Sequence, residues 1–126
     1  MSKVPSISDA EWEVMKIIWK QGEITANEIV KQLKENIDWK PNTIKTLINR
    51  LHNKEAIGFK KFGKEYSYYA LISEEECVKA ESESFLNRVF NGSLNSMLMN
   101  FVKSKQLSQK EIEELRSLLN KSERQE

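Results

Sequence analysis

One sequence pattern that marks the start of a helix occurs four times in this chain of 126 residues. In each copy an apolar residue precedes Ser or Thr, and Glu follows three positions after the hydroxyl residue. The hydroxyl can accept a hydrogen bond from an amide of the first helical turn, while the Glu side chain accepts one from the amide of the hydroxyl residue. The pattern therefore predicts helices that begin after Ser8, Thr25, Ser73 and Ser108.

Apolar residues at helical spacing predict three amphipathic helices in the first half of the chain. The expected core faces are Trp12, Met15, Ile18 and Trp19, then Ala26, Ile29, Val30 and Leu33, then Ile44, Leu47, Ile48 and Leu51. Gln21-Gly22 ends the first helix, and Pro41 suits the first position of the third. Either Asp38 caps a slightly longer third helix, or Lys40 occupies the cap position and is kept there for a phosphate.

The outer face of the third helix, residues 41–53, has no carboxylate. A step of 100° per residue places on that face Asn42, Lys45, Thr46, Asn49, Arg50 and Asn53, with Thr43 at its margin. An ordinary solvated helix face mixes Glu with Lys. Amides, hydroxyls and cations are instead the groups that pair with base edges and phosphates. The face is typical of a helix that contacts DNA bases.

Positive charge is concentrated around this helix. The segment 40–64 holds seven Lys or Arg residues against Glu55, a net charge of +6, although the whole chain has 20 basic and 19 acidic residues. A local positive field is expected of a surface that docks a polyanion. The alternative is a solvated basic face without a partner, and the amides and hydroxyls of the helix argue against it.

A β-hairpin is expected after the third helix. Residues 58–62 and 66–71 have the composition of strands, and Gly63-Lys64-Glu65 forms the turn. Three helices followed by a hairpin is the order of a winged helix-turn-helix, in which Lys60, Lys61 and Lys64 of the wing would contact phosphates. The tyrosines of the second strand are interpreted as packing residues of the wing.

The second half predicts a separate helical domain. We expect a DNA-binding domain at 1–72 and a dimerisation domain at 73–126, with helices from Ser73 to about Phe90, from about Ser93, and after Ser108. Three short amphipathic helices expose an apolar stripe in a monomer. A second copy would bury it and would present two DNA-binding helices to two half-sites; the alternative is that the helices fold back on the first domain. The expected interface residues are Phe85, Leu86, Leu94, Met97, Leu98, Phe101, Ile112, Leu115 and Leu119.

Composition argues against several other classes of protein. With 39% hydrophobic and 31% charged residues the chain is expected to fold, mainly as helices with a small hairpin wing. No apolar run approaches the roughly 20 residues that span a bilayer, and the start lacks a secretion signal, so a cytoplasmic location is expected. Single Cys77 and His52 residues predict no metal site. No catalytic set or phosphate loop is present, so we expect neither an enzyme nor a cofactor.

Four segments resemble the penicillinase repressors, the family of BlaI and MecI. They are ISDAEWEVMKIIW (7–19), DWKPNTIKTLINRL (38–51), SFLNRVFNGSLNSMLMNF (84–101) and LSQKEIEEL (107–115). The last two are the more specific, because many regulators share a winged helix. The resemblance implies a homodimer that represses β-lactam-resistance genes from palindromic operators. It also implies induction through a membrane β-lactam sensor with a metalloprotease domain, and cleavage of the repressor between Asn100 and Phe101.

The same resemblance assigns DNA-contacting positions in the third helix: Asn42, Thr43, Lys45, Thr46 and Arg50. Asn42 replaces a common Lys, Lys45 replaces a common Arg, and Lys40 replaces the usual Ser cap. Lys lacks the planar fork of Arg, so operator preference or affinity is expected to differ from that of relatives.

Three alternative functions compete with this one. A copper-responsive repressor similar to CopY would share the first domain but needs a Cys-rich metal motif, which Cys77 alone cannot form. A repressor of the same family could control genes unrelated to β-lactams. A winged-helix adaptor that binds only proteins would tend to have an apolar or acidic face, against which the charge of segment 40–64 argues.

Overall fold

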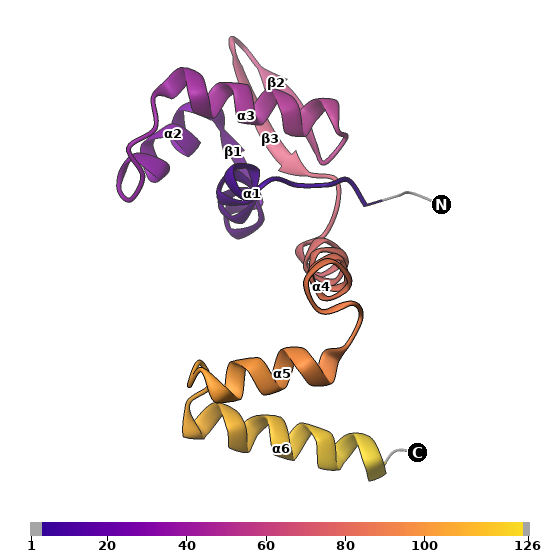
Figure 1. The fold of residues 1–126 in the computed structure, drawn as a ribbon. Coiled ribbons are helices and arrows are strands. Elements are labelled where there is room, and N and C mark those ends of the chain that lie inside the picture. The colour runs from indigo at the N-terminus through magenta and orange to yellow at the C-terminus, as the bar shows by residue number, and fades with distance from the viewer. Residues whose placement is uncertain (1–3, 125–126) are drawn as a thin grey trace. The chain divides into compact units, whose positions relative to one another are not determined.

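The computed structural model describes residues 4–124. In order the elements are α1 (Asp9–Gln21), β1 (Glu23–Thr25), α2 (Ala26–Lys34), α3 (Pro41–Asn53), β2 (Ile57–Phe62), β3 (Glu65–Ala70), α4 (Glu74–Phe90), α5 (Leu94–Lys103) and α6 (Gln109–Arg124) (Figure 1). The expected class, mainly helical with a small hairpin, is confirmed. The chain divides into two compact units, Met1–Glu81 and Ser82–Glu126, and the division falls inside α4.

All four predicted helix starts are confirmed. The hydroxyl accepts a hydrogen bond from the amide of the Glu three residues on, over 3.2, 3.3, 3.1 and 3.1 Å at Ser8, Thr25, Ser73 and Ser108. The reciprocal bond, from the amide of the hydroxyl residue to the Glu carboxylate, is present at Ser8 and Ser108. At Ser108, hydrogen bonds from the backbone amide and from the hydroxyl to the Glu111 carboxylate hold the pKa of Glu111 below its usual range. Local sequence alone therefore determines where these helices begin.

The core of the first unit lies between α1, α2, α3 and the sheet. The predicted face of α3 is buried in full, whereas α2 buries Ile29 and Leu33. Trp12 and Trp19, predicted on the same side of α1 as Met15 and Ile18, are half-buried and pack against the core, and the structure also buries Glu11 and Val14 of this helix. An indole N–H needs a hydrogen-bond partner, and that of Trp19 donates to the Ile72 carbonyl over 3.0 Å.

The sheet has three strands in the order β1-β3-β2, both pairings being antiparallel. The predicted hairpin is confirmed with small shifts: β2 begins at Ile57 and β3 at Glu65, which leaves Gly63 and Lys64 as the turn. Strand β1 was not predicted. Gly58 leaves room for the Tyr69 side chain, since a Cβ at this position would lie 2.9 Å from the Cζ and hydroxyl oxygen of Tyr69 and the tyrosine would have to shift.

A charged side chain lies inside this unit. Glu11 is 1% exposed, and its carboxylate forms an ion pair with Lys54, whose side chain is 35% exposed. Lys54 also donates to the Ser6 carbonyl oxygen over 2.8 Å, and Glu11 accepts from the Ser8 amide. The pair therefore ties the start of α1 and the segment before it to the end of α3.

The second unit consists of the end of α4, then α5 and α6. Asn91 and Gly92 both have positive φ and end α4 as expected, and the Ser93 hydroxyl caps α5 by accepting from the Ser96 amide over 3.1 Å. Between residues 82 and 123 every side chain is at least partly exposed to solvent. The unit therefore has no buried core of its own. No helix within residues 4–124 is long and apolar enough to cross a membrane.

Candidate nucleic-acid interface

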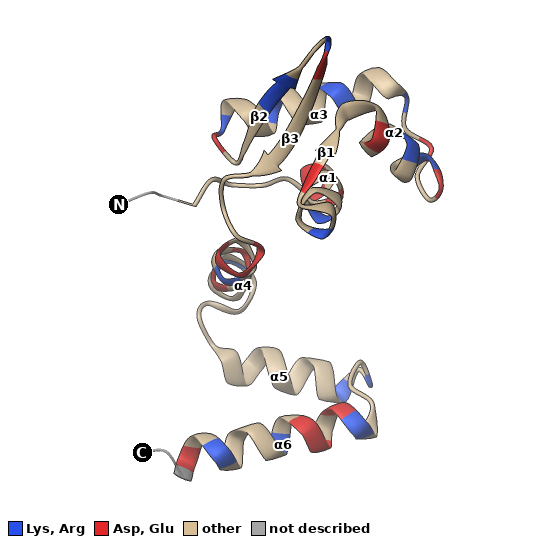
Figure 2. Ribbon diagram, turned by 180° about the vertical axis from the view of Figure 1, so that it is seen from behind, with Lys and Arg blue, Asp and Glu red and all other residues tan. Residues whose placement is uncertain are grey.

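The outer face of α3 is exposed, as the sequence predicted. Solvent reaches all of its polar residues: Asn42, Thr43, Lys45, Thr46, Asn49, Arg50 and Asn53. Figure 2 shows basic residues on α3 and no acidic one. The Thr46 hydroxyl donates to the Asn42 carbonyl oxygen over 2.9 Å. Its proton is therefore engaged in the helix, and it offers an acceptor to a ligand.

The N-terminus of α3 has an exposed cation beside it. Lys40 occupies the cap position, so Asp38 does not cap a longer helix, and the Lys40 side chain makes no capping hydrogen bond. The Lys40 carbonyl oxygen accepts from the Thr43 and Ile44 amides, over 2.9 and 3.3 Å. Pro41 has no N–H, so the Asn42 amide is the remaining backbone donor of the first turn, at the positive end of the helix dipole. This end of α3 suits an anion such as a phosphate.

The predicted wing lysines lie on different surfaces. Lys61 lies 5.7 Å from the centre of the Tyr66 ring, on the same side of the hairpin as Phe59, whose ring is 5.1 Å from that of His52 in α3. Because side chains alternate along a strand, Lys60 lies on the opposite side. There it approaches the Tyr69 ring and is 3.9 Å from a Glu23 carboxylate oxygen. Lys61 thus belongs to the α3 surface, and Lys60 does not.

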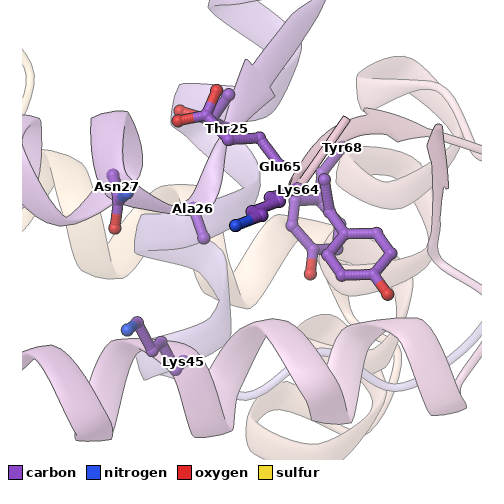
Figure 3. A pocket seen from close by; sticks show the side chains of 8 residues that line it. Thr25, Ala26, Asn27, Lys45, Lys64, Glu65 and Tyr68 are labelled. Carbon is purple, nitrogen blue, oxygen red and sulfur yellow. The ribbon is translucent and has the colours of Figure 1, made fainter. Parts of the chain in front are cut away.

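A groove connects α3 to the wing. It is lined by Thr25, Ala26, Asn27, Lys45, Lys64, Glu65, Tyr66 and Tyr68. Figure 3 shows Lys45 rising from α3 and Lys64 coming from the hairpin turn into the same space, with Thr25 and Asn27 at its other wall. Two ammonium groups and the N-terminus of α2 therefore border one groove, with Glu65 as its one carboxylate. Sequence reasoning identified Thr25 as a helix cap but gave no indication that α2 contributes to this surface.

Lys54 does not strengthen the field of this surface. It contributes to the net charge of segment 40–64, but its ion pair with Glu11 compensates that charge within the fold. Exposed cations on or beside α3 include Lys40, Lys45 and Arg50, and the hairpin adds Lys61 and Lys64. Within residues 4–124 no group of three or more His, Cys, Asp or Glu side chains could hold a metal ion.

Comparison with known proteins shows the family of the chain. The sequence model of the family described as penicillinase repressor matches residues 7–121 of this chain. The chain belongs to the penicillinase repressor family. The penicillinase repressor of Bacillus licheniformis is 47% identical over 94% of this chain and 93% of its own length. The methicillin resistance regulatory protein MecI of Staphylococcus aureus strain N315 is 47% identical over 95% of this chain and 98% of its own.

A solved structure of a BlaI protein aligns with part of this chain. The monomeric form of Bacillus licheniformis BlaI, in complex with the blaP half-operator, aligns with a TM-score of 0.53 at 45% sequence identity. The alignment covers 60% of this chain and 93% of that one. The two folds are therefore alike over the aligned residues.

Proposed function

We propose that this chain is a DNA-binding transcriptional repressor of β-lactam-resistance genes that acts as a homodimer on palindromic operators. The observation that carries the proposal is the exposed face of α3, which has amides, hydroxyls and cations but no carboxylate. Membership of the penicillinase repressor family supports it, as do the operator-bound relative and the MecI regulator.

In this proposal α3 lies in the major groove, where its outer face contacts bases and its first turn contacts the phosphate backbone. Asn42, Thr43, Lys45, Thr46 and Arg50 face bases and nearby phosphates. Lys40 and the first turn of α3 hold one phosphate, and the groove between Lys45 and Lys64 holds another. Lys61 contacts the backbone beside the wing.

The absence of a core in the second unit supports a dimer. Its helices expose large apolar side chains, with Leu94 and Leu119 53% and 56% exposed. The proposed interface residues are all half-buried or exposed: Phe85, Leu86, Leu94, Met97, Leu98, Phe101, Ile112, Leu115 and Leu119. Burying such surface against a second copy gives the unit the core that one chain lacks.

The proposed inactivation is cleavage between Asn100 and Phe101, triggered by a membrane β-lactam sensor protease system. This bond lies inside α5, whose carbonyl at Asn100 accepts from the Ser104 amide over 3.0 Å. A protease needs extended backbone, so the helix must open first. Opening is favoured by the short length of α5 and by its lack of buried residues. Cleavage would divide the apolar stripe on which dimerisation depends.

Arg50→Ala is expected to weaken operator binding by about 1–3 kcal/mol if Arg50 contacts a base, and binding to random DNA by less. The side chain is exposed on α3, so its removal leaves the core intact. Fluorescence anisotropy with an operator duplex and a scrambled duplex measures the two losses. Equal losses on both duplexes would assign Arg50 to the backbone alone.

Lys61→Ala is expected to weaken binding to every duplex alike and to reduce the slope of log K against log salt by about one. The reason is that Lys61 lies on the α3 side of the wing, where it neutralises a phosphate. Titrations at several salt concentrations measure the slope, with Lys110→Ala in α6 as the control. A slope unchanged from the wild type would remove Lys61 from the interface.

The function as a whole is tested by gel shift on the DNA immediately upstream of the gene, with unrelated competitor DNA present at two salt concentrations. Specific binding of two chains per operator supports an autoregulating repressor, and exposure of cells to a β-lactam then tests for cleavage after Asn100. Binding no tighter than to competitor contradicts the proposal for this operator and favours a protein-binding adaptor.

A further inference from the structure

Phe62 has no role in the interface proposed above. It is the last residue of β2, opposite Glu65 and beside the Gly63–Lys64 turn, so it lies at the tip of the wing. Figure 1 shows this tip extending past α3. The side chain is 64% exposed, as much as any large apolar side chain that the structure describes. An aromatic ring therefore stands in solvent at the most projecting part of the hairpin.

The other aromatic rings of the hairpin have packing partners. Phe59 and Tyr66 form an edge-to-face pair with ring centres 4.9 Å apart, and Tyr69 packs against Gly58 and Lys60. Within the described part of the chain, Phe62 takes part in no aromatic pair or cation–π contact. It contributes little to the stability of the wing, because burial is the source of an apolar side chain's contribution.

The surroundings of Phe62 are basic. Lys60, Lys61 and Lys64 lie within two residues of it, and Glu65 is the one acid among them. A protein partner would need about 800 Å² of complementary surface per side, which a single ring among lysines does not offer. The minor groove of DNA does match this chemistry, since it is about 6 Å wide with phosphates along both edges. Minor-groove proteins place apolar wedges such as Phe between base steps there.

We infer that Phe62 enters the minor groove beside the major groove that holds α3, and partly unstacks one base step. Lys61 and Lys64, the wing lysines on the α3 side, hold the flanking phosphates while the ring takes the apolar position between them. Unstacking from the minor groove bends DNA toward the major groove, which is the side on which α3 lies. The inference deepens the proposed function and depends on it.

The test compares the full-length wild type with Phe62→Ala and Phe62→Leu on duplexes from upstream of the gene. Each duplex carries 2-aminopurine at one position, moved stepwise across the bound region, because the fluorescence of this base rises when it unstacks. Phe62→Ala is expected to lose about 5- to 100-fold in affinity, the range of one aromatic–base contact, without change in the salt slope. Phe62→Leu, which keeps an apolar wedge, is expected to lose much less.

The fluorescence should rise at one step per half-site with the wild type and with Phe62→Leu, and should stay flat with Phe62→Ala. If the wild type binds specifically and Phe62→Ala binds with the same affinity, the inference is wrong and the proposed function is unaffected. Loss of affinity without any unstacking signal from the wild type also overturns it. If the wild type binds these duplexes no more tightly than competitor DNA, the proposed function fails, and this inference fails with it. Thermal melts of all three proteins are expected to coincide, since the residue is exposed.

Discussion

Leu98→Asp is expected to turn the protein into a monomer and to lower its affinity for a two-half-site operator by about 10²–10⁴-fold. The apolar stripe of α5 includes Leu94, Met97, Leu98 and Phe101. No residue of that helix is buried within one chain. A carboxylate in the proposed interface would have to lose its water. Once the dimer is lost, the second half-site no longer adds its effective concentration to binding.

Two measurements together test this prediction. Sedimentation gives the mass in solution, which should fall to the 14.7 kDa of one chain, and anisotropy compares a full operator with a single half-site. Half-site affinity should be unchanged, because Leu98 lies outside the first unit. Leu71→Asp is the matched control, since Leu71 is exposed but lies before α4. A Leu98→Asp protein that sediments like the wild type contradicts the proposed interface.

Lys54→Met is expected to destabilise the first unit by about 2–4 kcal/mol, somewhat less than for a fully buried pair because Lys54 is partly exposed. The change removes the partner of Glu11 and leaves a carboxylate with 1% exposure beside an apolar side chain. All three tryptophans, Trp12, Trp19 and Trp39, belong to this unit. Urea titration followed by tryptophan fluorescence therefore reports its unfolding alone. If the variant is as stable as the wild type, Glu11 is not left as an unpaired buried charge, and the prediction is wrong.

The pH dependence of stability should change sign in this variant. In the wild type, burial by itself raises the pKa of Glu11, but hydrogen bonds from Lys54 and Ser8 outweigh it and hold the pKa below its usual value. The pair therefore stabilises the fold above about pH 4.3, where an unfolded Glu is ionised, and this stabilisation is lost as the pH falls through the lowered pKa. The variant loses both contributions of Lys54, and burial is the largest single influence on the Glu11 pKa. We therefore expect a raised pKa in the variant, which would lose stability as the pH rises above the pKa of an unfolded Glu.

A second substitution separates the buried charge from the loss of packing. Glu11→Gln keeps an acceptor for the Ser8 amide, as a capping box allows, but has no charge. The double variant Glu11→Gln/Lys54→Met is expected to recover much of the stability that Lys54→Met loses. If the double variant recovers none of the lost stability, the contact of Lys54 with Ser6, and not the charge of Glu11, accounts for the loss.

Helix boundaries were predictable because the signals are local. A Ser or Thr with Glu three residues later, a Gly after the last turn, and Pro41 at a first turn each determine a helix end within a few residues of chain. The outer face of α3 followed from periodicity, since its four apolar residues orient the helix without ambiguity. These features depend on neighbours in sequence and on little else.

The features that were not predicted depend on distant contacts. Strand β1 has three residues, and Ile24-Thr25 already carries the capping pattern of α2, so its pairing with β3 leaves no separate signal. Glu11 has the composition of a solvated cap residue, and its burial becomes visible only when Lys54, 43 residues on, is seen beside it. The contribution of Thr25 and Asn27 to the groove likewise requires the hairpin to be in place.

Thr25 has a further consequence for the DNA that this protein can accept. It is both the last residue of β1, paired with Ser67 of β3, and the cap of α2. The wing and the N-terminus of α2 are thereby joined through backbone hydrogen bonds, and the span between them is set by the protein. A duplex must adopt the matching groove width to contact both, and stiff sequences do so at a greater energetic cost than flexible ones. Operator preference should therefore extend to base pairs that no side chain contacts.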